Sequence, residues 1–98
     1  MRNPTTFLTV DAIIFKKMND VNQVLLIERK NIPYKDHWAL PGGFVEENED
    51  LLIAVKRELF EETHIAIDDL QQLGAFGKPF GDPRGHVVSV AYYGFVHE

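Results

Sequence analysis

The sequence predicts an α/β fold in which helices cover a sheet. Segments 7–15 and 87–96 are rich in β-branched and aromatic residues and are apolar on both alternating faces, which is typical of strands covered on both sides. A segment that begins at Leu51 has the periodicity of an amphipathic helix. With 98 residues and 45% apolar content, we expect one core and a single domain over 1–98.

The N-terminal half is expected to form antiparallel strands. Segment 7–15 should be central in the sheet, and the polar residues 16–20 read as a turn. A second strand at 24–27 would run antiparallel to the first because the connection is short. Residues 31–36 then read as a polar loop, and segment 38–43, with one proline and two glycines, requires a special backbone path.

The C-terminal half is expected to contain the helix and the last strand. Asp50 fits an N-cap for a helix from Leu51 to near Thr63. Its apolar stripe is Leu52, Val55 and Leu59. Segment 66–75 is ambiguous between a turn and a strand beginning near Leu70 or Leu73, and 76–85 reads as a loop rich in Gly and Pro.

The predicted helix leaves apolar surface without a cover. Strands that are apolar on both faces require helices on both sides of the sheet, and the sequence contains one convincing helix. Ile53 and Phe60 also point away from the main helical stripe. We therefore expect a domain that lacks its C-terminal part, although a partner subunit on the other face accounts for the pattern equally well.

The charge balance excludes several classes of partner. Ten Lys and Arg against fifteen Asp and Glu give a net charge of −5, and no basic run exceeds two residues. This argues against a surface for nucleic acid or anionic membranes. The chain has no cysteine, which excludes disulfides and thiolate metal sites, and it has no signal-like or membrane-spanning segment. A cytoplasmic location is the default expectation.

Three glutamates of the predicted helix indicate a metal site. Glu58, Glu61 and Glu62 follow the spacing i, i+3 and i+4, which places their carboxylates on one helical face. Like charges at this spacing destabilise a helix by roughly 0.2–0.5 kcal/mol per pair, and a divalent cation removes that cost. Oxygen ligands of this kind suit Mg²⁺, with Mn²⁺ as the alternative, and such ions commonly bind substrate phosphates.

The glutamates belong to a longer motif. Gly43 is followed by five residues and Glu49, and then by seven residues and the run Arg57-Glu-Leu-Phe-Glu-Glu-Thr-His-Ile65. This pattern resembles the Nudix box at every fixed position except the last glycine, which is His64. The resemblance implies a Nudix-type α/β/α sandwich around a mixed sheet and a Mg-dependent hydrolase.

The resemblance also implies roles for the motif residues. It assigns metal binding to Glu58, Glu61 and Glu62, with the carbonyl of Gly42 as a further donor. Arg57 lies one position before Glu58 and is not expected to share the acidic arc. Its five donors should instead reach Glu49 and fix the geometry of the loop and the helix. The predicted catalytic set is Glu58, Arg57 and Glu49, and the general base is either Glu58 or a glutamate beyond the box, where the terminal Glu98 is the one acid after Asp82.

His64 departs from the family pattern. The missing glycine would lie just past the helix end, where a left-handed conformation is common, and a non-glycine residue there costs about 1 kcal/mol. The change is expected to affect the helix end and local stability more than metal binding. His37, His86 and His97 have no ligand spacing and read as ordinary histidines.

A second resemblance concerns the substrate. Segments 9–13, 33–34, 80–85 and 87–92 are similar to parts of the ADP-ribose pyrophosphatase group and its regulatory relatives. On that basis Arg29 and Arg84 are candidates to pair with phosphate or the terminal ribose, and Tyr34 to stack on adenine. Trp38 is assigned to packing. The alternatives to substrate binding are structural roles, in which Arg84 braces its loop and Tyr34 anchors the loop in which it lies.

Two functions follow from these resemblances. The first is a hydrolase that cleaves the diphosphate bridge of ADP-ribose or a related nucleoside diphosphate derivative. The second is the ADP-ribose-binding sensor domain of a transcriptional regulator of NAD metabolism, without efficient hydrolysis. The resemblance further implies a small-molecule partner and a homodimer, with no membrane and no nucleic acid bound by this chain alone.

Overall fold

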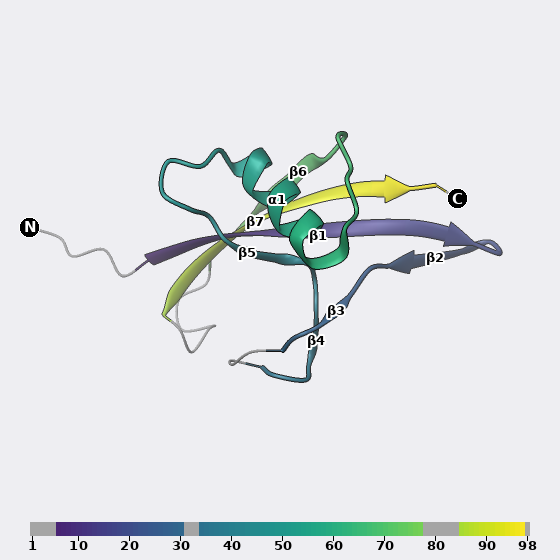
Figure 1. Ribbon diagram of the computed structural model, residues 1–98, viewed down its shortest axis with the longest axis horizontal. Helices are drawn as coiled ribbons and strands as arrows, with labels where there is room; N and C mark the ends of the chain where they lie inside the picture. Colours follow the sequence, from purple (N-terminus) through teal and green to yellow (C-terminus); the bar gives the residue numbers. More distant parts are fainter. Residues whose placement is uncertain (1–5, 31–33, 78–84, 98) are drawn as a thin grey trace, which may run out of the picture.

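The computed structural model describes residues 6–30, 34–77 and 85–97 and contains a mixed sheet with one helix packed on it. Strand β1 (Thr6–Met18) lies parallel to β7 (His86–Val96) and antiparallel to β2 (Val21–Val24) and β5 (Gly42–Phe44). Strand β6 (Gln71–Phe76) pairs antiparallel with β7. The order is β2-β1-β7-β6, with β5 beside β1, so β1 is central as predicted (Figure 1).

The turn after β1 is shorter than expected. The strand continues through Lys16 and Lys17 to Met18, and only Asn19 and Asp20 form the turn. Both have positive φ, 50° and 64°, as a two-residue hairpin turn requires, and Asn and Asp tolerate that conformation. The prediction that 16–20 is a turn was therefore wrong for its first three residues.

The predicted second strand, 24–27, is divided in the structure. The N–H of Leu25 still donates to Ile14 O at 2.9 Å, and the chain then leaves β1. Strand β3 (Ile27–Glu28) pairs instead with β4 (Trp38–Ala39) in a separate two-stranded ribbon (Figure 1). A continuous apolar run does not reveal where a strand changes its partner.

Helix α1 (Leu51–Thr63) covers one face of the sheet, with the bounds that the sequence predicted. Val10, Ala12 and Ile14 of β1 share the core with the helix, because alternate strand residues point to the same face. The core cluster contains Val10, Ala12, Ile14, Ala54, Val55, Leu59, Leu70, Val90 and Tyr92.

The opposite face of the sheet carries aromatic residues that the described part of the chain does not cover. Phe7 and Phe44 meet edge to face at 5.9 Å, and Phe15 stacks on Phe95 at 5.6 Å. Phe7 is 44% exposed and Phe95 is 57% exposed, in agreement with the expectation that one helix leaves part of the apolar surface uncovered. Ile53 and Phe60 are exposed as well, at 61% and 51%.

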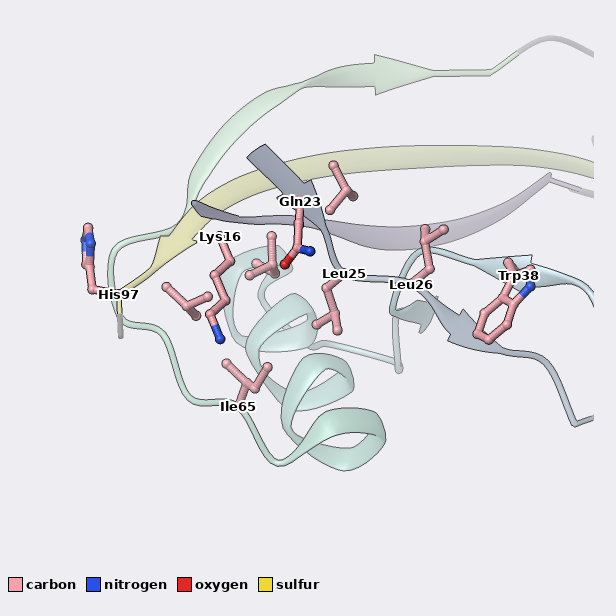
Figure 2. Close-up of a pocket in the computed structure, with 10 residues that line it drawn as sticks. Lys16, Gln23, Leu25, Leu26, Trp38, Ile65 and His97 are labelled. Atoms are coloured by element: carbon pink, nitrogen blue, oxygen red, sulfur yellow. The ribbon is translucent and has the colours of Figure 1, made fainter. Parts of the chain in front are cut away.

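Trp38 does not pack as predicted, since 68% of its surface is exposed. It lies at one end of a groove of about 930 Å³ beside Leu26, while Lys16 and Ile65 lie near the other end (Figure 2). Because β4 pairs only with the short β3 in the described chain, the sheet offers Trp38 no surface to pack on. Among the described residues, no helix has the length and apolarity needed to cross a bilayer.

Candidate active site

The ends of α1 are fixed by side chains that its sequence supplies. The Asp50 carboxylate accepts hydrogen bonds from the N–H groups of Leu52 at 3.0 Å and Ile53 at 3.2 Å, which makes it the N-cap. His64 has φ 61° and ψ 16°, the left-handed conformation expected for it, and its N–H donates to Phe60 O at 2.8 Å. These caps determine where the last two turns place their glutamates.

Arg57 binds Glu49 through two hydrogen bonds, as the motif predicted. Nε donates to Oε2 at 2.7 Å and Nη2 donates to Oε1 at 2.9 Å. Glu49 Oε1 also accepts from the N–H of Glu46 at 3.0 Å. The hydrogen bonds from Arg57 and Glu46 lower the pKa of Glu49 from 4.5 to about 2, and the bond to Glu49 raises the pKa of Arg57. The loop before the helix is thereby tied to the helix.

Arg57 also reaches the acidic arc, contrary to the prediction. Nη1 donates to Glu58 Oε1 at 2.8 Å and to Glu61 Oε2 at 3.3 Å. The prediction was wrong because it considered the helical angle of the Cα position, whereas the guanidinium extends far enough to turn its third nitrogen toward the glutamates. Nη2 additionally donates to Phe44 O at 3.2 Å, which connects the helix to β5.

Glu62 contacts β5 directly. Its Oε1 accepts a hydrogen bond from the N–H of Gly42 at 2.8 Å. Partial burial of the carboxylate raises the pKa of Glu62, the Gly42 N–H opposes that effect, and Glu58 adds to it. The structure therefore engages Gly42 through its N–H, while the predicted role of its carbonyl as a metal ligand stays a prediction.

Gly43 allows Glu58 to approach the strand. A Cβ at position 43 would lie 2.6 Å from Glu58 Cδ and 2.7 Å from each carboxylate oxygen, closer than real Cβ atoms approach other atoms. The φ of Gly43 is not positive, so backbone conformation does not call for a glycine. The close approach of the Glu58 side chain does. The two glycines thus bring β5 within contact of both Glu58 and Glu62.

A pocket of about 620 Å³ opens beside these groups. Arg29 is half-buried in its wall, and its backbone is fixed by hydrogen bonds from Arg29 N to His37 O at 2.9 Å and from Asp36 N to Arg29 O at 2.8 Å. The charged lining residues are Glu28, Arg29, Lys30, Glu61 and Glu62. The sequence prediction did not include Lys30, which lines this pocket beside Arg29.

Tyr34, another predicted substrate residue, is not among the residues that line this pocket. Tyr34 is 50% exposed, and its ring lies edge to face with that of His37 at 6.1 Å rather than in the pocket wall. Arg84 lies outside the described residues. Of the predicted substrate-binding set, Arg29 alone is placed by the described chain beside the glutamates.

The carboxylates suit a hard divalent cation, but they do not yet form a coordination shell. Within 6–30, 34–77 and 85–97, no three acidic or histidine side chains are grouped so as to hold an ion as they stand. Arg57 holds Glu58 and Glu61, and Gly42 holds Glu62. Their oxygen chemistry and the closeness of β5 fit Mg²⁺ or Mn²⁺, provided that Glu58 and Glu61 exchange Arg57 Nη1 for the ion.

Comparisons with known proteins agree with this site. The NUDIX domain model matches residues 6–98. The chain is 41% identical over 96 residues to the ADPR responsive transcriptional repressor NtrR of Acinetobacter baylyi, covering 96% of this chain and 38% of that protein. It is 47% identical over 85 residues to the ADP-ribose pyrophosphatase of Methanocaldococcus jannaschii, covering 87% and 48%.

Solved structures show the same fold. The NUDIX domain of Shewanella oneidensis NrtR, solved with ADP ribose, has a TM-score of 0.88 at 37% identity and is matched over 95% of this chain and 62% of that one. A MutT/nudix family protein from Enterococcus faecalis has a TM-score of 0.91 at 41% identity, over 98% and 39%. The chain thus spans less than half the length of each of these two curated relatives. The motif, its geometry and the match over residues 6–98 together show that this chain belongs to the Nudix family.

Proposed function

We propose that the protein is a divalent-cation-dependent hydrolase that cleaves the diphosphate bridge of ADP-ribose or a related nucleoside diphosphate derivative. The observation that carries the proposal is that Arg57 holds Glu49 against the helix, Gly43 lets Glu58 approach β5, and Gly42 holds Glu62. These contacts gather three carboxylates beside β5, and the pocket there also contains Arg29 and Lys30.

Each residue has a role in this proposal. Glu58, Glu61 and Glu62 hold Mg²⁺ or Mn²⁺, with the Gly42 carbonyl as a further donor. An ion held there would supply activation of a water and neutralisation of the charge that develops on the phosphate oxygens. Arg29 pairs with a phosphate of the substrate across the pocket.

The proton of the attacking water requires an acceptor. The candidate general base is Glu58, through whichever carboxylate oxygen does not hold the ion. Arg57 and Glu49 act by positioning Glu58 rather than by contacting substrate. The products from ADP-ribose would be AMP and ribose 5-phosphate.

The second candidate is an ADP-ribose-binding sensor domain without efficient hydrolysis. The hydrogen bonds that keep Glu58 and Glu61 on Arg57 favour this alternative, because a cation has to displace them. The similarity to a repressor described as ADPR responsive supports it too. A homodimer, expected from the family, is part of either proposal and is tested by light scattering after size-exclusion chromatography.

One experiment separates the two candidates. The protein is incubated with Mg²⁺ and ADP-ribose, NADH, nucleotide sugars or dinucleoside polyphosphates, and AMP release is measured beside calorimetric binding. Hydrolysis that is lost in Glu58→Gln supports the enzyme. Binding of ADP-ribose without AMP release supports the sensor, and neither binding nor release would contradict both.

A further inference from the structure

Asp11 is an unusual residue for its place in the fold. It lies in the middle of the central strand β1, half-buried on the sheet face opposite α1, where its neighbours on the same face of the strand include Ile13 and Phe15. Aspartate is depleted in strands, and a carboxylate taken from water needs partners. The proposed function gives this residue no role.

The partners of Asp11 come from the two strands on either side of it. On one side, the Ser89 hydroxyl of β7 donates a hydrogen bond to Asp11 Oδ2. On the other side, Gly42 of β5 is its cross-strand partner. A Cβ at position 42 would lie 2.6 Å from Asp11 Oδ1, so the carboxylate rests against the strand in the space that the glycine leaves.

The N–H of the same glycine, Gly42, binds a glutamate of the candidate metal site. Glu62 accepts from that N–H at 2.8 Å, and Glu58 presses against the adjacent Gly43 on the helix face. Strand β5 is only three residues long, so it has few ladder bonds of its own to fix its position. Carboxylates therefore close on β5 from both faces of the sheet.

We propose that Asp11, oriented by Ser89, is a positioning residue that holds β5 where the Gly42 N–H meets Glu62 and Gly43 meets Glu58. The inference rests on the proposed function in that these glutamates hold the cation. Ser89 fixes the rotamer of Asp11, and the fixed carboxylate blocks β5 from shifting toward the face opposite α1. Asp11 acts on Gly42 through steric contact rather than through its charge.

Amide hydrogen exchange of Gly42 tests the geometric part without any metal. Asp11→Ala is expected to reduce protection of the Gly42 N–H about tenfold relative to wild type, because its hydrogen bond to Glu62 loosens. Asp11→Asn keeps the side-chain shape and should stay within about twofold, and Ser89→Ala should fall between the two. Ile13→Ala, on the same face of β1, is the matched control for lost stability without loss of the Gly42 contact.

Mn²⁺ affinity, followed by electron paramagnetic resonance, tests the link to the site. Loss of an outer-shell partner typically weakens metal binding about tenfold or more, and that is expected for Asp11→Ala but not for Asp11→Asn. The inference is overturned if Asp11→Ala leaves Gly42 protection unchanged, or if Ile13→Ala lowers protection and affinity as much. If wild-type protein binds no Mn²⁺ while protection falls as expected, the proposed function fails and the role of Asp11 in holding Gly42 against Glu62 survives.

Discussion

Replacing Gly43 by alanine tests whether the position of Glu58 controls the reaction. The added Cβ would lie 2.6 Å from Glu58 Cδ, and ordinary van der Waals contact begins at 3.4 Å, so the carboxylate has to move by about 0.8 Å. Glu58 would then lose its 2.8 Å hydrogen bond from Arg57 Nη1 in its present geometry. A misplacement of about 1 Å costs up to roughly 100-fold in rate, so we expect hydrolysis of ADP-ribose to fall between about 10- and 100-fold.

The same substitution should change stability little. The φ of Gly43 is not positive, and the clash is with the movable end of a side chain rather than with backbone. Gly42→Ala provides the contrast, because its Cβ would meet the backbone oxygen of Val10 at 2.2 Å and would displace β5 itself. The assay is AMP release with Mg²⁺ beside the urea midpoint of each variant. A Gly43→Ala protein that hydrolyses ADP-ribose within about twofold of wild type would refute the reasoning.

Three further predictions concern the helix and its loop. Arg57→Lys keeps the charge but loses the two-point contact with Glu49, so AMP release should fall at least about tenfold, and an unchanged rate would contradict the positioning role. Since hydrogen bonds lower the pKa of Glu49 from 4.5 to about 2, its stabilising effect is complete above pH 4.5 and disappears as the pH falls through 2. The urea midpoint should fall over the same pH range. Glu49→Gln should remove this pH dependence, and a variant that keeps it would show that another group is responsible. His64→Gly relieves the left-handed strain at φ 61° and should stabilise the fold by about 1 kcal/mol without changing the rate, and a lower urea midpoint would contradict this.

Elements with strong periodicity were predictable from the sequence. The helix bounds Leu51 and Thr63 and the N-cap Asp50 agree with the structure because capping and the apolar stripe are local properties. Strand β7 was expected at 87–96 and begins one residue earlier. The strand after Leu70 was only one of two readings, and it contains an irregularity between Gln72 and Gly74 that breaks the alternation on which a prediction depends.

The contacts within the site were only partly predictable. Motif spacing placed Arg57 against Glu49, since both lie within one loop and the helix that follows. The bonds from Arg57 to Glu58 and Glu61 depend on how a long side chain bends, and spacing along a helix does not determine that. Arg29 enters the pocket through the β3–β4 ribbon, a tertiary arrangement without a periodic signal, while Trp38 in the same ribbon is left exposed.

The fixed spacing of the motif is explained by a closed set of contacts around β5. Gly43 meets Glu58, Phe44 O accepts from Arg57, and Arg57 in turn holds Glu49. The loop from 45 to 50 is held at its start by the hydrogen bond from Val45 N to Leu8 O at 3.0 Å, so its length sets how far Glu49 lies from the helix. An added residue in this loop would keep all the motif residues in the sequence but would separate Glu49 from Arg57 in space. For that reason the distances between the motif residues along the chain carry as much of the function as the residues themselves.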